Sequence, residues 1–174
     1  MKNIYKISVV FFVGLSIIVS SCKKEEQIIE GCTDSSAMNY LSNATSNDGS
    51  CIYAYEIAKG TWYFDFNCGD IDPSLLGITL PNSVNVKSEG DGVLTFEFSV
   101  LNEAIEVNGT INNNGEIDIP EQSIDITSIS APVIVKGDGS IESQDLGNLT
   151  LEYSVPLLPL LPNLSCYTDL RREE

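Results

Sequence analysis

The chain has 174 residues with 25 acidic and nine basic side chains, no histidine and a formal net charge of −16 at pH 7. This acidic excess argues against nucleic acid and anionic membrane surfaces as partners, because both bind basic patches. Without histidine, the chain also lacks the commonest neutral-pH general base and the commonest metal ligand.

Residues 1–22 have the three parts of a secretory signal. Lys2 and Lys6 form a basic start, an apolar run follows over residues 7–19, and two serines lead into Cys22. The apolar run is about a dozen residues long, shorter than the roughly 20 that cross a bilayer. The alternative interpretation is a plain secretory signal followed by an incidental cysteine.

The small residues before Cys22 resemble the lipobox of bacterial lipoproteins. In that family the signal is cut before the cysteine, whose thiol takes a diacylglycerol and whose new amine is acylated, for example with palmitate. The resemblance implies that residues 1–21 are a signal peptide and that Cys22 is lipidated. The membrane is then a partner through this anchor, since several acyl chains hold firmly where one holds only marginally.

Residues 22–30 are charged, and we expect them to form a tether. Lys24-Glu25-Glu26 resembles the export signal of surface lipoproteins in the Bacteroidota, which implies an outer-membrane location on the cell surface. The alternative is a solvated linker on a lipoprotein that faces the periplasm, because runs of charge are usually solvated.

Four cysteines remain once Cys22 is set aside, an even number in a chain expected to be exported. Four cysteines allow three pairings, and their order does not choose among them. Their location favours a local loop closed by Cys32–Cys51 and a long-range bridge between Cys68 and Cys166.

Residues 31–54 closely resemble a small module of secreted and surface proteins in the same bacteria, with the pattern CTDxxAxNYxxxAxxxDGSC. Asn47-Asp48-Gly49 is typical of a turn, in which Gly49 is free to adopt positive φ. We expect Ala37, Tyr40 and Ala44 to form a minimal apolar face. So small a unit needs its disulfide, which is worth roughly 3 kcal/mol.

The module also offers oxygen donors for calcium. Asp34, Asn39, Asn47 and Asp48 lie within one short loop and carry the hard oxygen ligands that calcium requires. Their spacing is not that of an EF-hand, and turns use Asn and Asp without any metal. Both interpretations stay open, and no other cofactor is expected.

From residue 55 to residue 174 the sequence has the texture of β-structure, with no helical period. Strands are expected at residues 61–66, 83–88, 93–100, 104–111, 116–119, 124–130, 132–136, 140–143, 148–155 and 163–171. Turns are expected at residues 90–92, 112–115 and 137–139. The fold class is therefore all-β, an antiparallel meander that forms a barrel or a sandwich.

Three features of this part resemble the lipocalin-like small β domains of lipoproteins in this bacterial group. They are the opening Gly60-Thr61-Trp62, the hairpin of residues 108–120 and a late cysteine in the closing strand. The resemblance implies a barrel in which Trp62 plugs a closed end and does not contact a ligand. If the first and last strands are neighbours, the bridge from Cys68 to Cys166 closes the barrel.

Two loops at the end of the barrel where this bridge lies are unusually apolar. One carries Leu75, Leu76, Ile78 and Leu80, and the other carries Leu157, Leu158, Leu160 and Leu161. Leaving each of these side chains in water would cost about 1.5–3 kcal/mol. We expect the loops to pack on each other as a cap. The alternative is a hydrophobic rim that docks an apolar ligand, a partner protein or a membrane.

No residue set predicts catalysis. Without histidine there is no Ser-His-Asp triad, and pairing of the cysteines leaves no free thiol. Six carboxylates lie within expected strands, and alternation places most of them on the side opposite the apolar face: Asp65, Glu97, Glu106, Asp118, Asp125 and Glu152. We therefore expect a non-catalytic, membrane-anchored binding or interaction module. The alternative is a structural envelope lipoprotein without a specific ligand.

Overall fold

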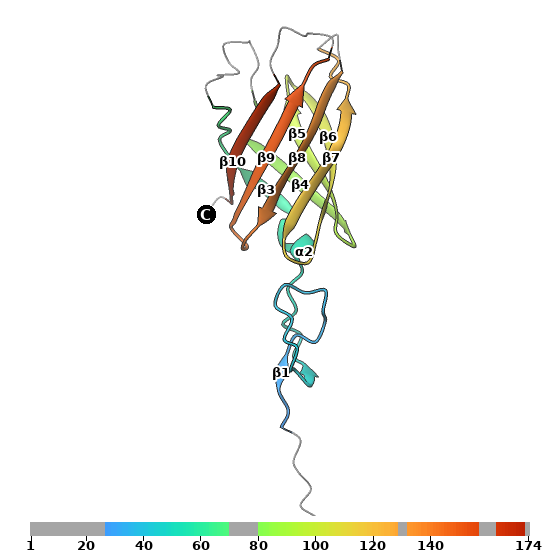
Figure 1. Ribbon diagram of the computed structural model, residues 1–174, viewed down its shortest axis with the longest axis vertical. Coiled ribbons are helices and arrows are strands. Elements are labelled where there is room, and N and C mark those ends of the chain that lie inside the picture. The colour runs from blue at the N-terminus through green and yellow to red at the C-terminus, as the bar shows by residue number, and fades with distance from the viewer. Residues whose placement is uncertain (1–26, 70–79, 129–131, 157–162, 173–174) are drawn as a thin grey trace, which may run out of the picture.

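The computed structural model of the chain describes residues 27–69, 80–128, 132–156 and 163–172 (Figure 1). Its elements are β1 (Glu30–Gly31), β2 (Ser46–Asn47), α2 (Ala54–Ala58), β3 (Gly60–Tyr63), β4 (Ser83–Gly90), β5 (Val93–Val100), β6 (Glu103–Ile111), β7 (Glu116–Ile124), β8 (Val133–Ile141), β9 (Leu146–Ser154) and β10 (Leu164–Arg171). Strands β3 to β10 form a closed antiparallel barrel in the order β10-β3-β4-β5-β6-β7-β8-β9. The all-β prediction is confirmed, and the chain adopts the barrel of the two expected forms.

Alternation along each strand determines which side chains enter the barrel. In β5, Leu94, Phe96 and Phe98 are buried, whereas Val93 and Ser99 on either side of them are exposed. Successive side chains of a strand point to opposite faces, so an apolar residue at every second position fills the interior. The inward side chains of all eight barrel strands therefore share one core.

The barrel closes between its first and last strands. β3 and β10 share one residue pair, and an isolated bridge continues the pairing from Asn67 to Tyr167. The disulfide between Cys68 and Cys166 lies directly beside this bridge. The predicted long-range disulfide and its place at the closure are both confirmed.

The turn expected at residues 137–139 is wrong, because β8 runs through it without a break. A Cβ atom at Gly137 would lie 2.3 Å from the carbonyl oxygen of Thr150, and one at Gly139 would lie 2.3 Å from that of Asn148. These glycines therefore permit the close approach of β9 and do not mark a turn. The turns at residues 90–92 and 112–115 are confirmed.

Strand β7 runs on past residue 119 to Ile124, and residues 125–128 form no strand, so the separate strand expected at residues 124–130 is wrong. Its register with β8 shifts between Ile119 and Gln122, and Pro120 lies within this irregularity. A β-bulge tolerates proline because the extra residue needs no ladder hydrogen bond. Proline thus bends the strand here and does not end it.

The short helix α2 corrects the expectation that the chain has no helix. Its Ala54 and Ala58 are buried in the barrel core, next to the hairpin turn of residues 90–92. We call this end of the barrel the closed end. The opposite end, where β5 meets β6 and β9 ends, we call the far end (Figure 1).

The small module of residues 31–54 lies beyond the closed end, between the barrel and the N-terminal segment (Figure 1). Met38 of the module packs against the barrel core, so the two parts are in contact. The Cys32–Cys51 disulfide closes the module, which confirms the predicted local bridge. Ala37 is buried and Ala44 half-buried, but Tyr40 is exposed and does not join the expected apolar face.

Candidate functional site

Trp62 and Arg172 hold the closed end. Trp62 is fully buried, and its indole N–H donates a hydrogen bond of 2.8 Å to the Ala58 carbonyl. The Arg172 guanidinium lies over the indole, with Cζ 4.4 Å from the ring centroid. The same guanidinium donates to the carbonyl oxygens of Ile57, Lys59 and Gln144. Trp62 is therefore a core residue of the closed end.

No sequence pattern indicates which arginine contacts Trp62, because Arg171 and Arg172 are neighbours at the end of the last expected strand. The two side chains leave the strand in opposite directions, and the other one, Arg171, pairs with Asp65 at 2.9 Å. Which arginine reaches the indole depends on the packing of the end of β10 against α2 and β3. That packing is not visible in the sequence.

Some inward side chains near the far end are less buried than those near the closed end, although Phe98 and Leu164 are buried there too. Near the closed end, Leu94, Leu149 and Leu170 are at most 2% exposed. Toward the far end, five inward apolar side chains are only half-buried, although they pack against the same core: Phe66, Val100, Ile105, Ile124 and Tyr153. We call these five the far-end ring. Because they come from four strands and the segment after β3, they surround the interior of the barrel.

Tyr153 brings a hydroxyl group into the far-end ring. On β9 it alternates with the buried Leu149 and Leu151, and it pairs with the buried Val135 and Leu164 on the neighbouring strands. Burial raises the pKa of the Tyr153 phenol above its ordinary value of 10.0. The hydroxyl therefore stays protonated and neutral at physiological pH. The alternation of residues 148–155 could have identified this inward tyrosine from the sequence.

The barrel wall is incomplete between β6 and β7. The two strands pair only at Thr110 with Asp118 and at Ile111 with Ile117. Farther along, the Gln122 side chain replaces a strand partner: its amide oxygen accepts from the Asn108 N–H at 3.0 Å, and its NH₂ donates to the Asn108 carbonyl at 2.8 Å. A side-chain amide thus satisfies backbone groups that would otherwise be unpaired.

Glu103 on β6 binds the segment that follows β7, near the far end. Its carboxylate accepts hydrogen bonds from the Ser128 hydroxyl, from the Thr127 N–H at 2.8 Å and from the Ser128 N–H at 2.9 Å. The Ser128 hydroxyl, followed by the Thr127 N–H, lowers the pKa of Glu103 from 4.5 to about 2. Glu103 therefore acts as an ionised clasp across the opening.

We expect Glu103→Gln to lower the melting temperature at pH 7, because an amide has one acceptor oxygen where the carboxylate has two. The folded-state pKa is depressed, so this stabilisation is present above about pH 4.5 and is lost as the pH falls toward 2. The difference in melting temperature between the two proteins should therefore shrink over that range. Thermal melts at pH 7, 4 and 2 measure it.

Glu89→Gln is the matched control for Glu103, since Glu89 is exposed on β4. It should change the melting temperature little at each pH. If the two variants behave alike, Glu103 is not a clasp.

A groove of about 640 Å³ lies along the wall beside the opening between β6 and β7. Its lining combines the apolar Phe98, Ile105 and Ile124 with the acidic Glu97, Glu106 and Asp125. Two members of the far-end ring, Ile105 and Ile124, are therefore reached from this side of the barrel. The groove also reaches residues of β3 and β4, such as Thr61 and Asn85, and no sequence pattern indicated it.

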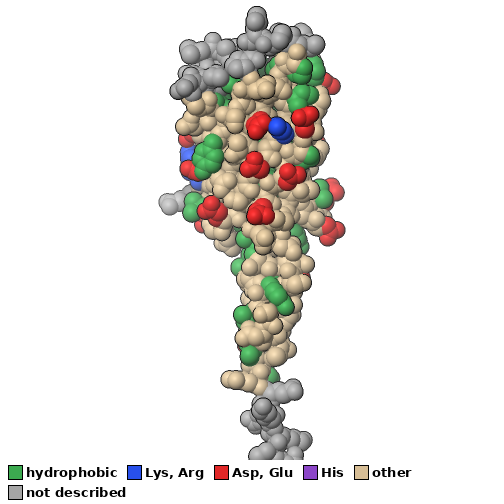
Figure 2. Space-filling view, viewed as in Figure 1, with side chains coloured by type: hydrophobic (Ala, Val, Ile, Leu, Met, Phe, Trp, Pro, Cys, Tyr) green, Lys and Arg blue, Asp and Glu red, His purple; other side chains and the backbone are tan. Residues whose placement is uncertain are grey.

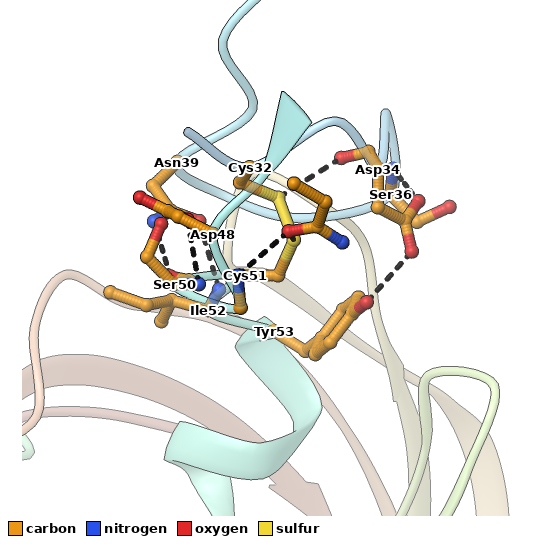
Figure 3. The surroundings of a disulfide bond; sticks show 11 residues. Cys32, Asp34, Ser36, Asn39, Asp48, Ser50, Cys51, Ile52 and Tyr53 are labelled. Carbon is orange, nitrogen blue, oxygen red and sulfur yellow. Dashed lines mark hydrogen bonds between the residues drawn. A yellow bond between two sulfur atoms is a disulfide. The ribbon is translucent and has the colours of Figure 1, made fainter. Parts of the chain in front are cut away.

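The predicted calcium donors of the module take part in its turns (Figure 3). Asp34 accepts from the Ser36 N–H at 2.8 Å and the Tyr53 hydroxyl at 2.7 Å, and these two bonds lower the pKa of its carboxyl. Asn39 bonds the backbone on both sides of Cys51.

Asn47 and Asp48 each accept from a backbone N–H two residues further along the chain, at 2.9 Å. Among the described residues, no group of three or more His, Cys, Asp or Glu side chains is placed to hold a metal ion. Calcium binding by the module stays a prediction.

The chain was compared with known protein families, curated protein sequences and solved structures. No protein-family model and no curated protein sequence matches the chain. A similar solved structure is "The crystal structure of Echinococcus granulosus fatty-acid-binding protein 1", with a TM-score of 0.33 and 11% sequence identity. The match covers 68% of this chain and 99% of that one.

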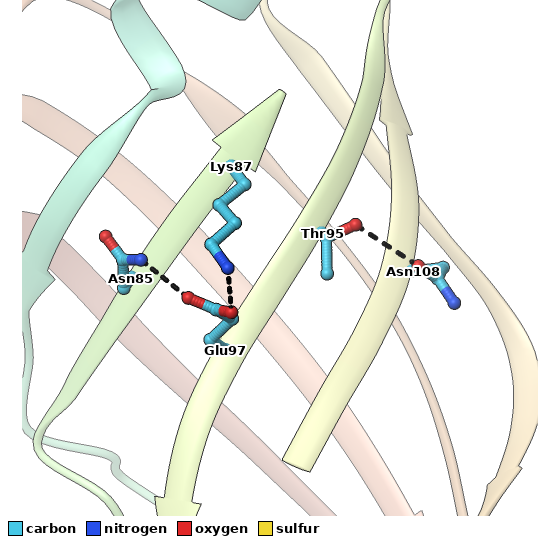
Figure 4. A network of polar contacts seen from close by, with 5 residues as sticks. All are labelled: Asn85, Lys87, Thr95, Glu97 and Asn108. Carbon is cyan, nitrogen blue, oxygen red and sulfur yellow. Dashed lines mark hydrogen bonds and ion pairs between the residues drawn. The ribbon is translucent and has the colours of Figure 1, made fainter. Parts of the chain in front are cut away.

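The outer wall is polar and acidic. The Glu97 carboxylate on β5 accepts from Lys87 and Asn85 on β4, and the Lys87 ammonium followed by the Asn85 amide lowers the pKa of Glu97 (Figure 4). Acidic side chains are spread over the barrel face in Figure 2. Of the six carboxylates considered above, Glu97 is half-buried and the others are exposed, all outside the apolar interior.

Several predicted site residues lie outside the described residues. They are Cys22, the expected lipidation site, and the apolar loop residues Leu75, Leu76, Ile78, Leu157, Leu158, Leu160 and Leu161. The lipid anchor and the choice between a cap and a rim therefore stay predictions. Within the part of the chain that the structure describes, no helix is long and apolar enough to cross a membrane.

Proposed function

We propose that this protein is an exported, lipid-anchored and non-catalytic module that binds a small apolar molecule in the far half of its barrel. The observation that supports this proposal is the far-end ring: inward apolar side chains that pack on the core yet stay half-exposed. An eight-stranded barrel has an interior just wide enough to be filled by side chains or to hold one small ligand.

The difference between the two ends of the barrel supports a ligand at the far end. At the closed end, α2, Trp62 and Arg172 fill the interior with protein atoms and satisfy one another's hydrogen bonds. The far-end ring still exposes apolar surface, and a ligand that covered it would gain roughly 25 cal/mol of free energy per Å² of apolar surface removed from water. Binding sites of this kind combine a mostly apolar lining with a few polar groups, as the ring does with Tyr153.

The proposed address places the far end away from the membrane. Residues 27–30, the described residues nearest to Cys22 in the sequence, extend from the module on the side opposite the barrel (Figure 1). A chain anchored through Cys22 would therefore present its closed end toward the outer membrane and its far end to the medium or to a partner protein.

Binding of 1,6-diphenylhexatriene, an uncharged probe that fluoresces in apolar sites, tests the ligand site. We expect saturable binding at one site per chain. Ile124→Ser should weaken binding about tenfold, because the loss of about 1.5 kcal/mol of apolar contact corresponds to that factor. Val93→Ser is the matched control, since Val93 is 49% exposed and lies on the outside of β5.

Absence of probe binding by the folded protein would reject the ligand site and favour a structural envelope lipoprotein. Equal losses in the two variants would place the probe outside the barrel.

The anchor has a separate test in cells of a lipoprotein-processing bacterium. The wild-type chain should fractionate with membranes, and metabolic labelling with a palmitate analogue should mark it. Cys22→Ser should abolish both, because the thiol that takes the lipid is absent. A variant that still partitions with membranes and carries label would contradict lipidation at Cys22.

A further inference from the structure

We infer that the ligand of the far-end ring is uncharged: an apolar chain or ring system that carries a hydrogen-bonding oxygen, such as an alcohol, ester or ketone, and not a carboxylate or phosphate. This inference rests on the proposed function and names the chemical class of its ligand.

The chain has nine cationic side chains, and the five within the described residues all lie away from the far-end ring. Four of the nine lie within residues 1–24: Lys2, Lys6, Lys23 and Lys24. Four more pair with acids in the described structure: Lys59 with Glu56, Lys87 with Glu97, Lys136 with Glu152 and Arg171 with Asp65. The ninth, Arg172, lies over Trp62 at the closed end.

The sequence adds no further cation between the described segments. Residues 70–79, 129–131 and 157–162 contain no lysine, arginine or histidine. The acids that line the groove beside the ring are Glu97, Glu106 and Asp125. An anionic head group at this place would therefore lose its water without gaining a counter-ion, and it would meet acidic neighbours. Burial of an unpaired charge is strongly unfavourable.

Tyr153 supplies the polar contact that an uncharged ligand needs. Its side chain points into the ring, between the buried Val135 and Leu164 of the adjacent strands. The phenol is protonated at neutral pH, because its ordinary pKa is 10.0 and burial raises this pKa further, so the hydroxyl can donate to a carbonyl or hydroxyl oxygen and can accept from an alcohol. A ligand with such an oxygen satisfies Tyr153, whereas a plain hydrocarbon does not.

A matched series of sixteen-carbon compounds tests the inference by displacement of 1,6-diphenylhexatriene from the full chain at pH 8. The series is hexadecan-1-ol, methyl hexadecanoate, hexadecanoic acid and hexadecane. We expect the alcohol and the ester to bind at least tenfold more tightly than the acid. Tyr153→Phe should reduce alcohol and ester affinity three- to tenfold and leave hexadecane unchanged.

A second variant reverses the preference. Ile124→Lys places an ammonium group in the ring, so the affinity for hexadecanoic acid should rise relative to the alcohol. If the wild-type protein binds the acid as tightly as the alcohol, the inference is overturned while the proposed function stands. If the probe itself does not bind, the proposed function fails first.

Discussion

Replacing Trp62 with alanine is expected to lower the free energy of unfolding by about 3–5 kcal/mol, the usual cost of truncating a buried large aromatic side chain. Trp62 is 0% exposed, and its indole both bonds Ala58 and supports the Arg172 guanidinium. Its loss would leave a cavity at the closed end and release the last strand. Urea unfolding followed by circular dichroism measures the effect.

Tyr167→Ala is the matched control, because Tyr167 is an aromatic barrel residue with 48% of its surface exposed. It should cost well under 1 kcal/mol, as surface substitutions usually do within about 0.5 kcal/mol. If Trp62→Ala costs no more than this control, Trp62 does not hold the closed end.

Arg172→Lys isolates the arginine. Lysine keeps the charge but lacks the planar fork, which stacks on the indole and reaches three carbonyl oxygens. We expect a loss of about 1–2 kcal/mol, the sum of one cation–π contact and part of the hydrogen bonding. If stacking on the indole causes the loss of stability, Arg172→Lys should cost less in a Trp62→Ala protein than in the wild-type protein.

Removing the Cys68–Cys166 disulfide is expected to have the second large effect. The two cysteines are 98 positions apart, and the chain-entropy model gives up to about 4.7 kcal/mol for a loop of that length, with less often measured. The Cys68→Ala/Cys166→Ala double variant should therefore unfold at a markedly lower urea concentration than the wild-type protein. The barrel would then close only through the short pairing of β3 with β10.

Cys32→Ala/Cys51→Ala is the control pair, because its loop spans only 19 positions and lies in the module. It should remove up to about 3 kcal/mol, mainly from the module, and leave the barrel transition close to that of the wild-type protein. Unchanged barrel stability without Cys68–Cys166 would contradict the role of that disulfide in closing the barrel.

Much of the fold was predictable because it depends on local patterns. Strict alternation in residues 93–100 determines which side chains enter the barrel, and the sequence Asn112-Asn113-Asn114-Gly115 determines a hairpin. The positions of the cysteines favoured the observed pairing, since Cys68 was expected at the end of the first strand and Cys166 at the beginning of the last. These patterns predict the folded structure reliably because each acts over a few neighbouring residues or through a covalent bond.

The candidate site was predictable only in part. Alternation places Tyr153 inward, but the half-exposure of the far-end ring is a property of the finished barrel. The clasp made by Glu103 and the bridge made by Gln122 exist because β6 and β7 separate after two residue pairs. Side chains that cross such an opening are far apart in the sequence and share no pattern.

The residues by themselves indicated an acidic all-β chain with two disulfides. Only the tertiary structure showed that Arg172 covers Trp62, that Gly137 and Gly139 lie within a strand, and that the inward side chains of the far-end ring are half-buried. The physical reason is the range of the interactions. Alternation and turn chemistry act locally, whereas strand register, close backbone approach and the burial of a side chain depend on the whole closed barrel.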